Sequence, residues 1–279
     1  MVRFSTIAFV LLAAGAASAA ERKFERTFEV SPGGVLTVNA DSASVNVSAG
    51  DTNQVRVTIN VRGEDEDLAK ATLDASQKDD GVTVIMRMRA KDSWSQHSPI
   101  MDGRINVTVP KHYGIDVRTD GGSVELVNTV GSARLRTSGG GIVAKNVDGN
   151  VEAKTSGGGI LAESIRGDVD ATASGGDVRL VHIDGKIRGQ TSGGSMKCSL
   201  VGTNRGISAT TSGGSIQLSL PKDTTANFEA TMSGGKFSSD IPFTATERRD
   251  EYVSGSINGG GETIEVRTSG GGVSLSAAN

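Results

Sequence analysis

The sequence of 279 residues is poor in several residue types that commonly stabilise a fold. It has one cysteine, Cys198, so no internal disulfide can form. Proline occurs only five times and aromatic residues make up 4% of the chain, so stability has to come from aliphatic packing and backbone hydrogen bonds. The formal net charge is only −3 and no basic stripe is present, which argues against nucleic acid as a partner.

Long apolar runs are also scarce, and the one at the N-terminus has the form of an export signal. Arg3 is followed by an apolar run from Ile7 to Ala14 and then by the A-x-A cleavage pattern Ala17-Ser18-Ala19. The run is too short to span a bilayer, and no later segment approaches eighteen apolar residues. We therefore expect residues 1–20 to be a signal peptide. The mature chain would reside in the periplasm or at the cell surface, or outside the cell, without a transmembrane anchor.

Glycine, by contrast, is abundant at 38 residues, and much of it falls in a repeat. A four-residue unit that ends in Ser-Gly-Gly or Asp-Gly-Gly recurs along the chain. The serine or aspartate of successive units is separated by 18, 18, 18, 18, 20, 21 and 36 residues. Such a period marks a stacked repeat architecture. The last spacing accommodates either two turns or one turn with a long excursion. The serine or aspartate of each unit is Asp120, Ser138, Ser156, Ser174, Ser192, Ser212, Ser233 or Ser269.

Within each repeat the apolar residues alternate with polar ones, which is the pattern of β-strands with one buried face. One inward row, five residues before the serine or aspartate, is Ile115, Ala133, Val151, Val169, Ile187, Ile207, Phe228 and Ile264. A second strand follows the glycines, and a further apolar residue at the next corner precedes another glycine. Stacked coils would pair equivalent strands in parallel and bury a continuous core. The sequence therefore predicts an all-β chain, a parallel β-solenoid with coils of about eighteen residues; its handedness stays open.

Two columns of side chains test this register. The outward residues Asp116, Arg134, Glu152, Asp170 and Arg188 would stack on neighbouring strands, where opposite charges favour the pairing. The repeated threonine before each serine shares the parity of the inward rows, so we expect a buried hydroxyl ladder rather than an exposed ice-binding face. These threonines are Thr119, Thr137, Thr155, Thr191, Thr211 and Thr268.

Residues 21–118 are also rich in alternating strand patterns and form the expected N-terminal start and cap of the solenoid. The segment Glu64 to Ser76 is its only helical candidate, with Leu68 and Leu73 on one face. The regular repeats then span 119–279, with an excursion near 241–257. The last strand, Val273 to Ala277, has no obvious cap, so we expect it either to pair with a second copy of the chain or to be covered by the excursion.

Several motifs together resemble a known bacterial family. Val107-Thr108-Val109-Pro110, the segment 115–119, the repeated Thr-Ser-Gly-Gly coils and the closing segments 257–261 and 264–270 are similar to the adhesin-like β-strand-repeat proteins of unknown function. The resemblance covers nearly all of the mature chain. It implies an exported β-solenoid and carries no catalytic residues.

Catalytic and metal sites find little support in the residues. Outward charges change sign from coil to coil and no carboxylate pair recurs, unlike the clustered acids of polysaccharide-cleaving β-helices. Calcium-binding solenoids need an aspartate after the glycines, and here only Asp177 fits. His97, His112 and His182 lack metal-ligand spacing. Cys198 lies on an inward row as a small core residue. We expect no enzyme activity, no cofactor and no metal.

Two irregular segments are the candidates for binding a partner. The stretch 91–102 carries Trp94 and His97, and the stretch 243–252 carries Arg248, Arg249 and Tyr252. Aromatic and arginine side chains on long loops are frequent contact anchors, although Trp94 could equally pin its own loop to the scaffold.

The sequence thus predicts an exported, non-enzymatic binding or surface-interaction module of adhesin-like character, whose partner is a protein or glycan of the cell envelope. Self-association through the C-terminal coil is a further expectation. The alternatives are a structural or stress-related envelope scaffold and, less favoured, a carbohydrate-active β-helix enzyme.

Overall fold

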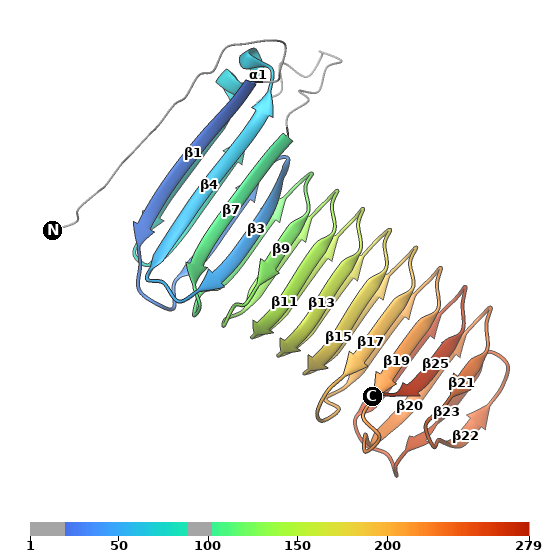
Figure 1. Ribbon diagram of the computed structural model, residues 1–279. Coiled ribbons are helices and arrows are strands. Elements are labelled where there is room, and N and C mark those ends of the chain that lie inside the picture. Colours follow the sequence, from blue (N-terminus) through green and yellow to red (C-terminus); the bar gives the residue numbers. More distant parts are fainter. Residues whose placement is uncertain (1–19, 89–101, 279) are drawn as a thin grey trace.

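The computed structural model describes residues 20–88 and 102–278, and within them nearly all regular structure is β-strand. The strands form two long sheets that face each other across a shared core (Figure 1). The twelve-stranded sheet contains, in spatial order, β1 (Ala20–Glu29), β4 (Gln54–Gly63), β7 (Asp102–Pro110), β3 (Ala43–Gly50), β9 (Val124–Val127), β11 (Ile142–Asp148), β13 (Ile160–Arg166), β15 (Val178–Asp184), β17 (Met196–Leu200), β19 (Ile216–Leu220), β25 (Val273–Ala277) and β21 (Phe237–Ser239).

The thirteen-stranded sheet supplies the other half of each coil. Its strands, in spatial order, are β22 (Thr244–Arg248), β23 (Tyr252–Ile257), β20 (Ala226–Met232), β24 (Thr263–Thr268), β18 (Ile207–Thr211), β16 (Ile187–Thr191), β14 (Val169–Ala173), β12 (Val151–Thr155), β10 (Ala133–Thr137), β8 (Gly114–Thr119), β2 (Val35–Ala40), β6 (Gly81–Arg87) and β5 (Thr72–Lys78). Each regular coil therefore places one strand in each sheet, which confirms the predicted parallel β-solenoid.

The register between coils is the one that the repeat predicts. Strand β10 pairs in parallel with β8 and β12, and equivalent residues such as Ala133 and Val151 lie opposite each other. The predicted inward row from Ile115 to Ile264 is buried throughout, as is the corner row of Val147, Ile165 and Ile183. Cys198 is buried in the same core, and desolvation raises the pKa of its thiol to about 12. Aliphatic side chains of modest size thus fill a thin core along the whole stack.

The two glycine corners of each coil use glycine for different reasons. At the Ser-Gly-Gly corner the backbone of neighbouring coils approaches too closely for a side chain: a Cβ on Gly140 would lie 2.5 Å from the carbonyl carbon of Gly122. The opposite corner needs positive φ, with Gly149 at 151°. Close backbone packing is therefore the reason for glycine on the Ser-Gly-Gly side, and positive φ is the reason at Gly149.

The threonine column forms the buried hydroxyl ladder that the sequence predicts. Thr155 Oγ1 donates to the carbonyl oxygen of Gly140 on the preceding coil at 2.7 Å, and it accepts from the backbone N–H of Gly158 at 3.3 Å. The same pair of contacts recurs at Thr137 and Thr191. Each hydroxyl thus accepts a hydrogen bond within its own corner and donates one to the corner of the preceding coil.

At the N-terminal end, chain order and spatial order differ. The first coil, β2 and β3, lies between the coil of β8 and β9 and an outer coil of β6 and β7. Antiparallel strands β5, β4 and β1 then cover that outer coil. The helix α1 (Asp65–Lys70) is shorter than predicted, because the chain from Thr72 forms β5 and Leu73 packs in the sheet.

Arginine side chains close the edge of this N-terminal end. Arg22 donates to the backbone carbonyls of Leu68 and Ala71, and Arg26 donates to that of Ala75. Strand β1 therefore leans over β5 and satisfies carbonyl groups that an open edge would expose. Such protection opposes edge-to-edge aggregation.

The C-terminal end repeats this arrangement in reverse. The last coil, β24 and β25, inserts between the coil of β18 and β19 and an outer coil of β20 and β21. The antiparallel hairpin of β23 and β22 continues the sheet beyond β20. The last spacing of 36 thus contains one turn, β21 and β24, with the hairpin of β22 and β23 as a long excursion between them. Both strands of the C-terminal coil are paired on each side, so the premise of an uncapped last strand available for self-association is wrong.

Candidate functional site

A groove with a volume of about 620 Å³ lies on the outer face of the thirteen-stranded sheet. It crosses β2, β8, β10, β12, β14 and β16 at right angles to the strands. At the usual strand spacing of about 4.8 Å, these six strands span about 24 Å. We call this feature the sheet groove. Its shape suits an extended ligand better than a compact one.

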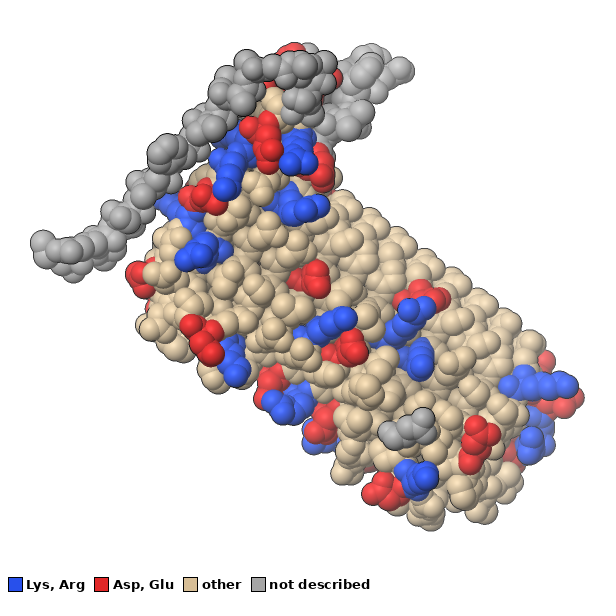
Figure 2. Space-filling model, in the orientation of Figure 1, with Lys and Arg blue, Asp and Glu red and all other residues tan. Residues whose placement is uncertain are grey.

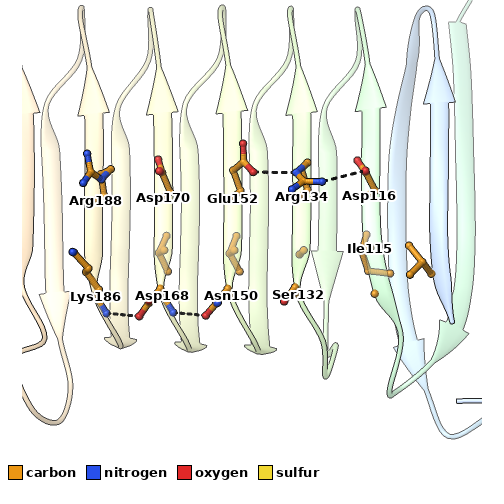
Figure 3. Close-up of a pocket in the computed structure, with 15 residues that line it drawn as sticks. Ile115, Asp116, Ser132, Arg134, Asn150, Glu152, Asp168, Asp170, Lys186 and Arg188 are labelled. Atoms are coloured by element: carbon orange, nitrogen blue, oxygen red, sulfur yellow. Dashed lines mark hydrogen bonds and ion pairs between the residues drawn. The ribbon is translucent and has the colours of Figure 1, made fainter. Parts of the chain in front are cut away.

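Two rows of polar side chains border the sheet groove, and the inward-row residue Ile115 lies between them (Figure 3). The strand row points outward from the middle of each strand, and the corner row comes from the residue just before each strand. The strand row is Asp116, Arg134, Glu152, Asp170 and Arg188; the corner row is Ser132, Asn150, Asp168 and Lys186.

One half of the strand row is neutralised within the protein. Arg134 lies 3.7 Å from Asp116 and 3.0 Å from Glu152, and Glu152 also contacts Arg136 at 2.9 Å and Lys154 at 2.7 Å. Hydrogen bonds from Lys154, Arg136 and Arg134 lower the pKa of Glu152 to about 2. This carboxylate therefore stays ionised and is a poor general acid.

Two side chains of the corner row are held by hydrogen bonds from the backbone. Asn150 Oδ1 accepts from the N–H of Asp168 at 2.9 Å, and Asp168 Oδ1 accepts from the N–H of Lys186 at 2.9 Å. Asn150 and Asp168 are thus each fixed by the next coil, in the same geometry at successive steps of the stack.

The other half of the sheet groove, at β14 and β16, keeps its charges free. Within residues 20–88 and 102–278, the side chains of Asp170, Lys186 and Arg188 form neither a hydrogen bond nor an ion pair. Lys186 and Arg188 are exposed. Both signs of charge are therefore available to a ligand at this end.

The family of the chain follows from its sequence and agrees with this architecture. The model of the Toastrack DUF4097 family matches residues 35–276. The chain belongs to the Toastrack DUF4097 family. The match covers the whole solenoid, from the first coil to the last, and the resemblance to β-strand-repeat proteins inferred from the sequence is confirmed.

Solved structures similar to this Toastrack chain come from other bacteria. A candidate adhesin from Bacteroides fragilis NCTC 9343 is 14% identical, with 92% of this chain and 97% of that chain covered, at a TM-score of 0.36. A candidate adhesin from Parabacteroides merdae ATCC 43184 is 8% identical, with the same coverage and a TM-score of 0.39. A candidate cell adhesion protein from Clostridium sporogenes ATCC 15579 is 12% identical, covering 92% and 100%, with a TM-score of 0.29. A search of the curated proteins finds no match.

Of the partner-binding residues expected from the Toastrack sequence, the three that the structure describes do not line the sheet groove. Trp94 and His97 lie outside the described residues. Arg248, Arg249 and Tyr252 belong to the hairpin of β22 and β23, separated from β16 by β20, β24 and β18. Arg249 lies over the Tyr252 ring, 5.8 Å from its centroid, and pairs with Glu247. The hairpin contacts thus form a small cluster of their own.

The strand row, which is one wall of the sheet groove, was predicted from the sequence as a column of charges that favours the register and not as part of a binding site. Arg134 does lie between Asp116 and Glu152. The corner row was missed. Its signal is the polar residue that recurs six positions before each serine, as in Asn150 and Asp168.

A metal centre and a membrane-spanning helix are two other features that would indicate a function, and the described stretches contain neither. In the described stretches no group of three or more His, Cys, Asp or Glu side chains is placed to hold a metal ion. None of the helices in those stretches has the length and apolar character needed to cross a bilayer.

Proposed function

We propose that this Toastrack protein is an exported, non-enzymatic binding module of the cell envelope, and that the sheet groove is where it holds an extended ligand. The observation that carries the proposal is the groove itself: a channel across six coils, bordered by two rows of polar side chains, of which Asn150 and Asp168 are held by hydrogen bonds. A wall of this kind places polar side chains at equivalent positions of successive coils, which suits a polymer.

The chemistry of the groove favours binding over catalysis. General acid catalysis at neutral pH needs a carboxyl group with a raised pKa, and Glu152 has a lowered one. Asp116 and Glu152 each contact Arg134, as in a structural ion-pair network. The face of the twelve-stranded sheet also mixes Lys and Arg with Asp and Glu without a large area of one sign (Figure 2). A surface-interaction role, adhesin-like in character, is consistent with these features.

Export supports the envelope setting. The proposal includes removal of residues 1–20 as a signal peptide, on the n-region, the apolar run and the A-x-A pattern. N-terminal sequencing of the protein recovered from the cell envelope tests this step, and an intact Met1 start on the envelope protein would refute it.

A blocking substitution tests the groove. Ser132 lies in the corner row, is exposed and makes no side-chain hydrogen bond in the described chain, so Ser132→Trp fills the channel without removing a structural contact. The matched control, Ser138→Trp, places the same bulk at the opposite corner of the same coil, where Ser138 is also exposed. Binding of the tagged residues 21–279 to a glycan array and to fractionated envelope polymers is measured for all three proteins.

The proposal expects saturable binding that Ser132→Trp abolishes and Ser138→Trp leaves unchanged. Binding that survives Ser132→Trp but fails in Trp94→Ala or Arg248→Ala would move the site to the loops expected from the sequence. A stably folded chain with no groove-dependent ligand would favour a structural envelope scaffold.

A further inference from the structure

The charges that line the sheet groove nearly cancel. Its cations are Arg134, Lys186 and Arg188, and its anions are Asp116, Glu152, Asp168 and Asp170. What distinguishes the cations is whether a side chain of the protein already engages them.

The two cations without an acidic partner lie at one end of the sheet groove, beside Asp168 and Asp170. Arg134, Arg136 and Lys154 are engaged by acidic side chains, above all Glu152. Lys186 and Arg188 have no such partner among the described residues. They flank the channel from its two sides, Lys186 in the corner row and Arg188 in the strand row (Figure 3).

We propose that the β14–β16 end of the sheet groove binds the anionic groups of a polysaccharide, with Lys186 and Arg188 as the groups that hold them. This inference rests on the proposed function and specifies its ligand class. Arginine presents several N–H donors in a planar fork that matches carboxylate and phosphate, and lysine adds a point charge. The free carboxylate of Asp170 accepts hydrogen bonds from the sugar hydroxyls.

The geometry also favours a sugar chain over a compact anion. Coils repeat at about 4.8 Å, close to the length of one pyranose unit in an extended chain, so successive sugars meet side chains at equivalent positions of successive coils. Between the polar rows, the side chains of Ala133, Val151 and Val169 are buried in the core, so the two polar rows supply the contacts to a ligand.

The test uses four defined probes against residues 21–279. Two are anionic, a hexamer of galacturonic acid and a phosphorylated mannose hexamer, and two are their neutral counterparts, a galactose hexamer and a mannose hexamer. Dissociation constants are measured by calorimetry at low and at high salt. The two anionic arms separate a carboxylate ligand from a phosphate ligand.

The variant is the double substitution Lys186→Ala with Arg188→Ala, and its matched control is Lys197→Ala with Arg56→Ala. The control removes the same charge from exposed positions outside the groove, on β17 and β4 of the twelve-stranded sheet. Thermal unfolding of both variants shows that the fold is kept.

We expect at least one anionic hexamer to bind about tenfold or more tightly than its neutral counterpart, and to weaken with salt. The groove variant should lose that advantage while the control keeps it. Equal binding of anionic and neutral hexamers, or full anionic binding by the groove variant, would overturn the inference. Neutral-glycan binding that Ser132→Trp abolishes would leave the proposed function standing and reject only the anionic class. No groove-dependent binding of any probe or envelope polymer would refute both.

Discussion

The hydroxyl ladder predicts a paired result from two opposite substitutions. Thr155→Val keeps the shape of the side chain and removes the hydroxyl that bridges Gly140 and Gly158. The Gly140 carbonyl and the Gly158 N–H then lose their partner, and the site is partly shielded from water because Thr155 itself is only 5% exposed. An unsatisfied buried group costs about 1–3 kcal/mol, and the added methyl group returns about 0.8 kcal/mol. We expect a net loss of about 1–2 kcal/mol.

The natural interruption of the ladder supplies the reverse experiment. Ala173 lies in register between Thr155 and Thr191 and is buried, but it has no hydroxyl. In Ala173→Thr the new Oγ1 should donate to the Gly158 carbonyl and accept from the Gly176 N–H, as its neighbours do. A hydrogen bond of this kind contributes about 0.5–1.5 kcal/mol.

Thermal and urea unfolding, followed by circular dichroism, measures both variants. A change of 1 kcal/mol should move the melting temperature by about 2–4 °C for a domain of this size. Thr155→Val should lower the temperature and Ala173→Thr should raise it. If Thr155→Val leaves the free energy of unfolding unchanged, or if both substitutions shift it in the same direction, the threonine hydroxyls do not stabilise the stack.

Three further predictions concern other parts of the solenoid. Gly158→Ala should lower the free energy of unfolding by more than about 2 kcal/mol, because its Cβ would lie 2.5 Å from the Gly140 carbonyl carbon. Gly141→Ser should lower it far less, because the same position of other coils already holds a serine; urea unfolding measures both variants. Cys198 should resist thiol reagents at pH 8 until the protein is unfolded, because its pKa is raised to about 12; rapid labelling of the native chain would contradict its burial. Glu152 has a depressed pKa of about 2, so its contribution to stability is complete above the ordinary value of about 4.5 and is lost as pH falls toward 2; Glu152→Gln should flatten that acid limb of the pH–stability curve, and an unchanged limb would refute the assignment.

Much of the solenoid could be predicted because its signals are local. Alternation such as Ile115-Asp116-Val117 places side chains on two faces of a strand, and a period of 18 brings equivalent residues of neighbouring coils together. The inward rows, the threonine ladder and the Asp116–Arg134–Glu152 contacts all follow from these two periods. The helix was overextended because Thr72 and Leu73 fit a helical face by spacing alone, and only their pairing with β6 decides otherwise.

The candidate site was harder to predict because it combines two rows from different parts of each coil. Arg188 and Lys186 are close in sequence, but the channel between them depends on how the corner turns and on which residues leave a gap. The expected anchors Arg248 and Tyr252 were chosen for residue type on a long loop. In the structure they lie on an antiparallel hairpin at the end of the stack.

The amino-acid sequence by itself determined the content of each coil, its core rows and its parallel register, because these depend on periods of two and eighteen residues along one chain. Only the tertiary structure decided the order of the coils at both ends. Strands such as β18 and β20 present similar edges, and either could accept β24 by its side-chain pattern. Pairing β24 with both at once gives every strand of the last coil a partner, and this long-range hydrogen bonding places the chain's final coil inside the stack.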